Sequence, residues 1–524
     1  MVIHFRPIFL SFIFLALGIY SFSQYSFGIK WLLIVPCVIA LLYFLVLGVS
    51  KPFSEKVFSF LLKGISYCLV CVVAFGVGVG LFALTKADYK LDFVPLPSEN
   101  YEVSGVVDGN CLHNDSASYF FLKDVTVIEN GKEIKLQRKL RVYFSKNAET
   151  NVNLDSINSG DKVSLWGVMR SNPVFKDKSI NSFAYKNGFQ HTIYPDPITL
   201  TVSHGQSNLF DVIKNTVKEN YQQNLDKPYA GFAYSVFSGD RSELDRSIVQ
   251  SFSAIGIAHL VAISGLHVGF LVVLVMWLLS RMKNKWIKFG IVLVVLGLYS
   301  VFCGATPSVL RASLMAIFLM LGKLLGKQTD NLNSVSLAGI VILLFAPLDI
   351  FELGFLLSFA GVFGIFFLYP VFKDAFSFLK FKWLIEGVAL TLAADIATMP
   401  IIANAFGYVS ILSLVGNLLL VPLFGWIFMV MFVLTVIVLI LPFLKFLLNI
   451  VEWGVWLLIH SASLLSSLPF ASFKFAGFGT GALISYYTGM FVSSRFLVVN
   501  YKIKLALITL CYVTFATFLL ILLI

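Results

Sequence analysis

The sequence predicts a polytopic α-helical membrane protein with about 12 transmembrane helices and an inserted small β-barrel soluble domain that is OB-like. Of its 524 residues, 58% are hydrophobic and 13% are charged, and the mean hydropathy is +0.86. A soluble core does not absorb that much apolar surface. Between the apolar parts, residues 88–208 alternate apolar and polar side chains and are broken by Gly, Asn and Asp, as short strands are.

The formal net charge is +11, and its position along the chain decides what it means. Residues 86–229 contain 17 Lys and Arg and 17 Asp and Glu. The positive excess therefore lies in the apolar part and its short loops, where basic residues mark the cytoplasmic side. This pattern favours a membrane-orientation signal over a general affinity for nucleic acid.

Residues 1–85 are expected to hold the N-terminal transmembrane helices. Apolar spans cover residues 8–28, 31–50 and 57–85. Basic residues before the first span and around the link between the second and third predict that residue 86 emerges on the outer side. The first span is not a cleaved signal peptide, because it is long and a second span follows at once.

Residues 86–208 are expected to form the OB-like domain on the extracytoplasmic side, from about five short strands. Of the six cysteines only Cys111 lies there, so no internal disulfide is expected. Residues 209–257 form a connector that starts with an amphipathic helix, expected to lie on the membrane or on the barrel.

Residues 258–524 are expected to form a transmembrane channel domain. About nine apolar segments are expected there: 258–280, 289–304, 308–325, 334–348, 353–372, 384–403, 410–441, 443–468 and 477–524. The last should contain two spans. The segment 410–441 is too long for one straight crossing and contains Asn417 and Pro422, so a short re-entrant piece is expected in it.

The connector and the channel domain meet in residues 239–269, GDRSELDRSIVQSFSAIGIAHLVAISGLHVG. Polar side chains near bilayer depth cost free energy and are functional candidates by default. Ser264 and His267 are three residues apart and are expected on one helix face. Hydrogen bonds between helices, a polar pore lining and a nucleophilic serine all fit this pattern. A base on the same helix rarely aligns with its nucleophile, and no oxyanion-stabilising group is visible.

Further polar residues lie within or beside the later apolar segments. Arg311 lies one turn into its segment and must pair there, with Asp349, Glu352 or Asp395 as candidate partners. An interhelical ion pair and a contact to phosphate remain equally open for Arg311. Asp395 and Asn417 suggest either a cavity with irregular backbone or helix packing.

Two sequence motifs of hydrolytic enzymes are missing. There is no Walker G-x-x-x-x-G-K-[ST], so the sequence does not predict ATP hydrolysis by that route. There is no H-x-H-x-D-H, and the seven histidines are scattered, so no metallo-hydrolase, metal or other cofactor is expected.

Together these stretches resemble the ComEC family of competence proteins. GDRSELD, IGIAHLVAISGLHVG, TPSVLRA and GFLLSFAGVFGI carry the resemblance, and NSFAYKNGFQHTIY (181–194) is similar to the end of that family's soluble domain. The resemblance implies a channel or translocator, not an enzyme, which lies in the cell inner membrane and passes single-stranded DNA inward during natural transformation. It also implies a periplasmic DNA receptor and a cytosolic helicase or strand-binding protein as partners.

The sequence departs from the family in three ways. The metallo-β-lactamase-like domain of many members is missing, which makes strand degradation by this chain improbable and a separate nuclease possible. Leu356 and Asp395 stand where members often have Gln, and Cys111 is alone where some relatives have a disulfide.

Two sets of residues are the candidate DNA contacts. The DNA path or pore lining is expected to include Asp240, Arg241, Arg246, His259, Ser264, His267, Arg311, Glu352, Asp395 and Asn417. The OB-domain contacts are expected to be Tyr119, Phe121, Lys135, Arg138, Arg141 and Tyr143. The alternative for the second set is barrel core and a solvated face. The alternatives for the whole chain are an intramembrane serine hydrolase and a small-solute transporter.

Overall fold

The computed structural model describes residues 2–3, 6–24 and 55–523 apart from short gaps. The gaps are 97–98, 114–116, 130, 146–153, 155–156, 158, 177–178, 204, 206–208, 327–330, 379, 469–470, 476, 495–496 and 499–500. The span expected over residues 31–50 lies outside the described residues. The chain divides into two compact units: unit 1 is Met1–Ile13, Asn220–Ile342 and Leu353–Ile524, and unit 2 is Phe14–Glu219 and Leu343–Glu352.

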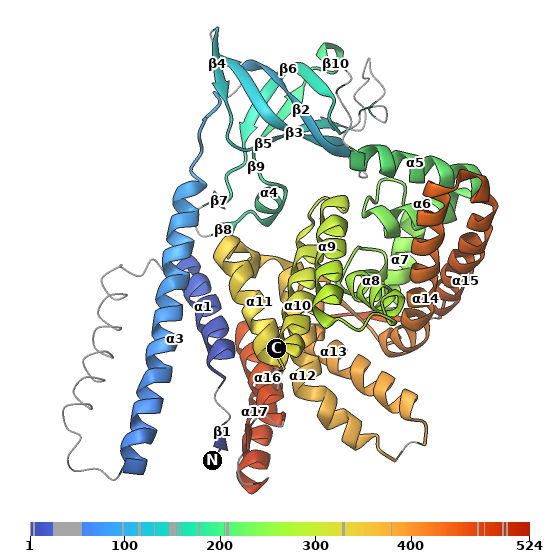
Figure 1. The fold of residues 1–524 in the computed structure, drawn as a ribbon. Helices are drawn as coiled ribbons and strands as arrows, with labels where there is room; N and C mark the ends of the chain where they lie inside the picture. The colour runs from blue at the N-terminus through green and yellow to red at the C-terminus, as the bar shows by residue number, and fades with distance from the viewer. Residues whose placement is uncertain are drawn as a thin grey trace. The chain divides into compact units, whose positions relative to one another are not determined.

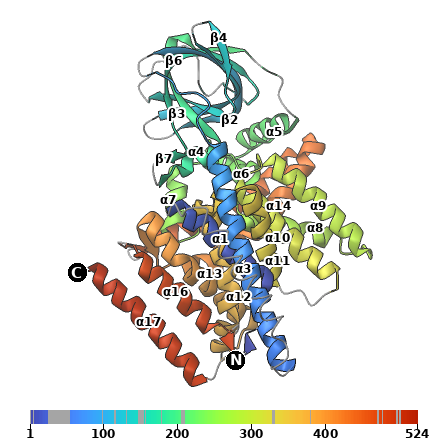
Figure 2. The same cartoon turned by 90° about the vertical axis from the view of Figure 1, so that its left-hand side faces the viewer.

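Unit 2 contains a closed five-stranded barrel (Figures 1 and 2). Its strands are β2 (Asn100–His113), β3 (Ala117–Glu129), β5 (Lys139–Ser145), β6 (Lys162–Ser171) and β9 (Phe189–Pro195). β2 pairs with β3 and β6, β3 pairs with β5, β5 pairs in parallel with β9, and β9 pairs with β6 to close the ring. β4 (Lys132–Lys135) and β10 (Thr201–Ser203) add to β3 and β6. This Greek-key arrangement confirms the predicted OB-like barrel.

The barrel core follows from the two-residue period of its strands. In β5 the side chains of Leu140, Val142 and Phe144 are buried, and those between them are not. Because successive side chains of a strand point to opposite faces, Arg141 and Tyr143 lie on the outer face.

In the part of the chain that the structure describes, two helices precede the barrel, α1 (Pro7–Gln24) and α3 (Glu55–Asp88). They approach through glycines: a Cβ on Gly18 would lie 2.2 Å from the Phe75 carbonyl oxygen, and one on Gly78 would lie 2.2 Å from that of Leu15. Small residues allow such close backbone contact between apolar helices.

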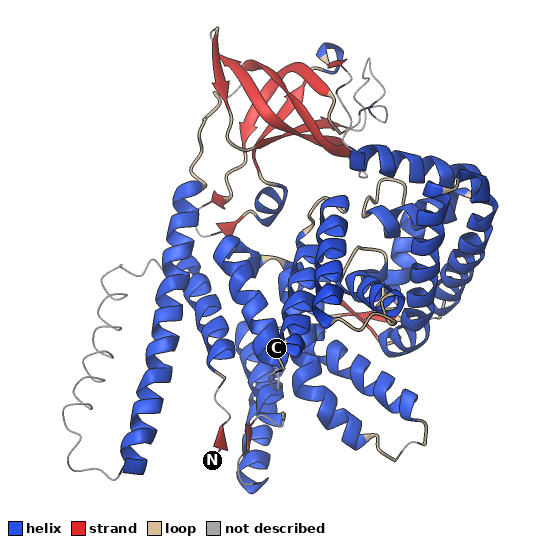
Figure 3. Ribbon diagram, viewed as in Figure 1, coloured by secondary structure: helices blue, strands red, loops and turns tan. Residues whose placement is uncertain are grey.

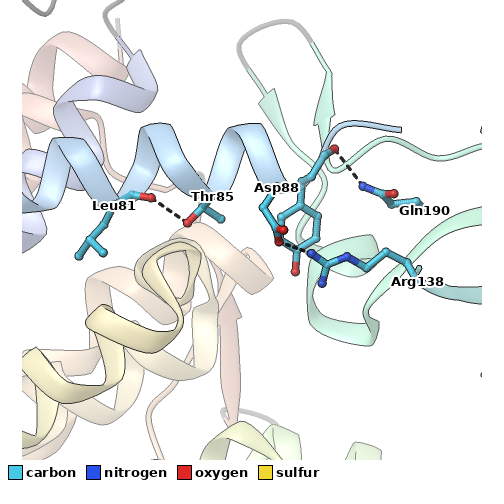
Figure 4. Close-up of polar contacts among 6 residues, drawn as sticks. Leu81, Thr85, Asp88, Arg138 and Gln190 are labelled. Carbon is cyan, nitrogen blue, oxygen red and sulfur yellow. Dashed lines mark hydrogen bonds and ion pairs between the residues drawn. The ribbon is translucent and has the colours of Figure 1, made fainter. Parts of the chain in front are cut away.

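The end of α3 is tied to the barrel by polar contacts (Figure 4). Asp88 forms an ion pair with Arg138 at the start of β5. The Gln190 amide of β9 donates to the Tyr89 carbonyl at 2.9 Å. The guanidinium of Arg138 also lies 4.1 Å from the centre of the Tyr89 ring. Charge, hydrogen bond and ring contact together fix the orientation of this end of α3 on the barrel.

Unit 2 also includes two short helical segments outside the barrel strands. α4 (Ser182–Asn187) precedes β9, and the 3-10 helix η4 (Pro347–Phe351) follows α11. The Tyr185 hydroxyl of α4 donates to the Asp349 carboxylate of η4 at 3.2 Å. The helix α5 (Leu209–Asn224) carries the chain from unit 2 into unit 1.

Unit 1 is helical, and Figure 3 shows how little strand it contains. Its helices are α6 (Lys227–Ser238), α7 (Arg246–Ala254), α8 (Gly265–Leu278), α9 (Lys285–Phe302), α10 (Pro307–Leu324), α11 (Asn331–Phe345, mostly in this unit), α12 (Leu353–Ala375), α13 (Lys382–Phe406), α14 (Ser413–Ile440), α15 (Leu448–Ser466), α16 (Thr480–Ser493) and α17 (Tyr501–Leu523). In the described part of the whole chain, seven helices are long and apolar enough to cross a membrane, and three shorter helices are apolar.

Two expected spans differ from the structure. Residues 258–280 are not one helix: a 3-10 turn, η3 (Ala258–Leu260), and an extended Ser264 precede α8. Residues 410–441 contain no re-entrant piece. α14 is continuous through Pro422, because transmembrane helices tolerate proline where neighbouring groups satisfy the freed carbonyl. The chain departs from helical backbone just before α14, where β11 (Tyr408–Ser410) pairs with β12 (Ser472–Lys474).

Candidate functional site

The polar sequence between α6 and α7 forms a defined turn. Helix α6 ends at Gly239, whose φ of 83° is in the left-handed region that glycine tolerates. The Asp240 carboxylate then accepts from the Ser242 backbone N–H at 2.9 Å, and that of Asp245 accepts from Ser247 at 2.8 Å to cap α7. Asp240, a predicted path residue, therefore shapes the backbone around Arg241.

The two arginines of this turn are exposed. Arg241 stands in the turn itself, and Arg246 is the first residue of α7. Reduced hydration within the protein lowers the pKa of Arg241 from its ordinary value. A guanidinium nevertheless stays charged at neutral pH, so Arg241 presents a positive charge from incompletely hydrated surroundings.

A second break in the helices separates α7 from α8. Gly256 has a φ of 74°, and His259 lies in the turn of η3. The His259 side chain is exposed. An uncharged imidazole has one hydrogen-bond donor and one acceptor.

Ser264 and His267 do not share a helix face, because Ser264 is the residue that caps α8. Its backbone is extended, and its hydroxyl accepts from the Leu266 N–H at 3.3 Å. His267 Nδ1 lies 3.3 Å from the Ser264 backbone nitrogen, completing a capping box. The two side chains do meet as expected, with Ser264 Oγ and His267 Nδ1 3.3 Å apart, but the contact terminates a helix.

This geometry is unfavourable for a nucleophilic serine. Nδ1 of His267 accepts from the Ser264 backbone N–H, so its capacity to take the hydroxyl proton is shared. In a catalytic triad the other ring nitrogen is oriented by a carboxylate. Nε2 of His267 is buried without a hydrogen-bond partner in the described part of the chain, and the ring packs against Phe424 and Phe428 of α14.

Four predicted path residues lie at these two breaks. Arg241 lies in the first and His259 in the second, which ends where Ser264 contacts His267 directly. His267 itself is fully buried.

Asp395 and Asn417 form a second polar group near the same loop. The Asn417 amide of α14 donates to the Asp395 carboxylate of α13 at 3.3 Å. A Cβ on Gly416 would lie 2.8 Å from the Ile255 carbonyl oxygen. The first turn of α14 therefore packs directly on the backbone of the second break, as the sequence alone does not reveal.

Arg311 is 4% exposed in α10. The helix begins at Pro307 after Ala305, which adopts the left-handed region with a φ of 50°. A Cβ on Gly354 would lie 2.8 Å from Arg311 Nη2, so the glycine at the start of α12 leaves room for the guanidinium. Glu352 belongs to unit 2, as does Asp349, which accepts from Tyr185.

The predicted contacts of the barrel occupy different environments. The register of β3 and β5 places Tyr119 opposite Tyr143 and Phe121 opposite Arg141. Phe121 is 8% exposed and its ring lies 5.5 Å from that of Phe189, so it is packed in the barrel wall.

The three predicted cations of the barrel also differ from one another. The Arg141 guanidinium lies 5.4 Å from the Tyr143 ring centre and 5.1 Å from that of Phe189. Lys135 is exposed on β4. Arg138 is held by Asp88, so its contacts join α3 to the barrel.

Sequence reasoning missed two surface residues, Arg170 of β6 and Tyr194 of β9. Both are exposed, and the neighbours Met169 and Ile193 are buried. The alternation that predicts strands also marks these two residues as outward-facing, but β6 and β9 lack the run of basic and aromatic residues that characterises residues 119–146.

The chain is similar to a known family and to individual known proteins. The family model described as Competence protein matches residues 236–498, most of which lie in unit 1. ComE operon protein 3 of Bacillus subtilis (strain 168) is 33% identical over 195 residues, which cover 37% of this chain and 24% of that protein. No solved structure matches the chain.

Two uncharacterized proteins are also similar. YcaI of Escherichia coli (strain K12) is 27% identical over 206 residues, 37% of this chain and 27% of YcaI. A protein of Aquifex aeolicus (strain VF5) is 29% identical over 218 residues, 41% of this chain and 48% of that protein. The chain thus matches about a quarter to a half of the length of these relatives.

Proposed function

Because the chain belongs to the competence protein family, we propose that it is the channel component that moves single-stranded DNA across the cytoplasmic membrane during DNA uptake. The observation that carries this proposal is that Arg241 lies at one helix break and His259 and the Ser264–His267 pair at a second, within one apolar unit. Irregular backbone with polar side chains is tolerated at membrane depth where it lines a hydrated path.

The chemistry of these residues suits a transported polyanion. Arg241 supplies a positive charge for phosphate, and an uncharged His259 supplies hydrogen bonds that form and break without holding the strand. Conduction requires binding that is strong enough for entry and weak enough for release. One charge among neutral polar groups meets that requirement better than a dense cluster of arginines.

In this proposal the barrel lies on the extracytoplasmic side and receives the strand first. A periplasmic DNA receptor would deliver the DNA, a separate nuclease would remove the other strand, and a cytosolic helicase or strand-binding protein would supply the drive. The positive-inside pattern of the loops supports this orientation, and the absence of a Walker motif from the sequence supports an external energy source.

The test follows labelled DNA in a deletion strain complemented with the wild type, Arg241→Ala or Arg281→Ala. Arg281 is the matched control, because it is also an exposed arginine but lies between α8 and α9, away from the two breaks. We expect DNA to bind the deletion strain without reaching the cytoplasm, and Arg241→Ala to restore uptake less well than Arg281→Ala at equal protein level. Normal uptake in the deletion strain would refute the proposal.

A further inference from the structure

The outer face of the barrel carries a row of tyrosines that runs across three strands. Tyr119 of β3 lies opposite Tyr143 of β5 in the strand register. β5 pairs in parallel with β9, and the ring centres of Tyr143 and Tyr194 are 5.4 Å apart. Three phenol rings from separate parts of the sequence therefore occupy neighbouring positions on one surface.

A second row, one step along the strands, carries two arginines. Arg141 of β5 lies opposite Thr192 of β9, and Thr192 lies opposite Arg170 of β6. Arg141 Nε donates to Thr192 Oγ1 at 3.1 Å. Thr192 thus lies between the two arginines, and its hydroxyl accepts from Arg141. The two arginines flank the tyrosine row.

Each guanidinium lies over a ring of the tyrosine row. Arg141 Cζ is 5.4 Å from the Tyr143 ring centre and Arg170 Cζ is 5.2 Å from that of Tyr194. Neither arginine forms an ion pair with a carboxylate in the part of the chain that the structure describes. Both retain their charge, and the guanidinium of Arg170 and the Nη groups of Arg141 can donate to another anion.

The face is accessible where β9 and β6 meet. Tyr194 is 36% exposed and Arg170 is exposed, while Arg141 and Tyr143 are half-buried. Phe183 of α4, 42% exposed, borders the face, with its ring 6.2 Å from that of Tyr119. Aromatic rings and cations therefore alternate across this face, which is most exposed at Arg170 and Tyr194.

We infer that this tyrosine–arginine face (Tyr119, Tyr143, Tyr194, Arg141 and Arg170) binds single-stranded DNA, with bases stacked on the tyrosines and phosphates bound by the arginines. The inference rests on the proposed function and extends it to β6 and β9. Stacking on aromatic rings needs an exposed base face, which a duplex does not offer. A duplex would engage the arginines alone, so the face selects the single strand. The strands must then be separated before the DNA reaches this face.

The test measures binding of a fluorescein-labelled oligothymidylate to the full chain in lipid nanodiscs by fluorescence anisotropy. Tyr194→Ala removes the most exposed ring, and Tyr194→Phe keeps a ring for stacking. Arg170→Ala is compared with Lys162→Ala, which removes the same charge from an exposed position at the other end of β6. Thermal unfolding of each variant verifies that the barrel remains folded.

We expect Tyr194→Ala to weaken binding about tenfold and Tyr194→Phe to bind nearly as the wild type. Arg170→Ala should weaken binding more than Lys162→Ala does, and an unlabelled duplex of equal length should compete poorly.

Three results would overturn the inference. Wild-type affinity in both Tyr194→Ala and Arg170→Ala would overturn the inference. The proposed channel function would be unaffected, because it is tested by the arrival of DNA in the cytoplasm. Equal competition by the duplex would overturn the selection of single strands. If the oligonucleotide does not bind the wild type, the face is not a DNA-binding site. The uptake experiment tests the channel function separately.

Discussion

His267 and Ser264 satisfy each other's polar groups at the start of α8: the histidine Nδ1 accepts from the serine backbone N–H at 3.3 Å, while the serine hydroxyl caps the helix. This reciprocal pair ends the irregular stretch that begins at Gly256. The two residues resemble a nucleophile and its base, but their contacts instead position the start of α8 beside His259.

The capping role predicts how Ser264 responds to substitution. Ser264→Ala should lower the free energy of unfolding by about 1 kcal/mol, because the first turn of α8 loses its acceptor. Ser264→Asn should retain stability and DNA uptake, since asparagine caps a helix as well as serine does. Thermal unfolding and uptake of labelled DNA measure the two effects. Loss of all function in both variants at normal protein level would instead indicate that the hydroxyl reacts.

The packing of α12 on α13 predicts a sharp contrast between two glycines. A Cβ on Gly364 would lie 2.3 Å from the Ala397 Cβ and 2.5 Å from the Ala393 carbonyl oxygen. Gly364→Ala should therefore separate the helices and destabilise the protein by about 1–3 kcal/mol.

Gly361 is the matched control for this prediction, one turn earlier on the same helix. A Cβ there would meet only Thr398 Cγ2 at 3.6 Å, so Gly361→Ala should be neutral or stabilising by up to about 1 kcal/mol. Thermal unfolding in detergent compares the two variants. Equal melting temperatures would contradict the close approach of α12 and α13.

The ion pair of Arg138 with Asp88 predicts a measurable coupling between the barrel and α3. The two side chains are 27% and 65% exposed. A double-mutant cycle of Arg138→Ala and Asp88→Asn should therefore give a coupling energy of about 0.2–1 kcal/mol. Arg138→Lys should recover only part of it, because lysine lacks the planar group that lies over Tyr89. Lys135→Ala, on exposed β4, should show no coupling to Asp88. Additive effects of the Arg138 and Asp88 substitutions would refute a structural role for the pair.

The strands and long helices were predictable because their signals are local. Alternation marks β5 and β6, and apolar runs mark helices such as α12. The break at residues 255–264 was not predictable, because its composition is as apolar as that of the helices around it. Arg138 resembled a DNA contact because its partner, Asp88, is 50 residues away. Likewise, no local signal places Tyr194 beside Tyr143, since a parallel pairing of distant strands creates that contact.

The buried His191 of β9 predicts a loss of stability in mild acid. Burial lowers its pKa below the ordinary 6.5, and its Nε2 lies 2.7 Å from the Phe93 carbonyl oxygen, to which it donates. The unfolded chain therefore takes up a proton first as the pH falls below about 6.5, and the free energy of unfolding decreases until the pH reaches the lower folded pKa. Chemical denaturation across this range should show that decrease for the wild type and a flatter profile for His191→Gln, whose amide retains a donor but does not titrate. Other histidines contribute equally to both proteins, so identical profiles would exclude His191 as the source.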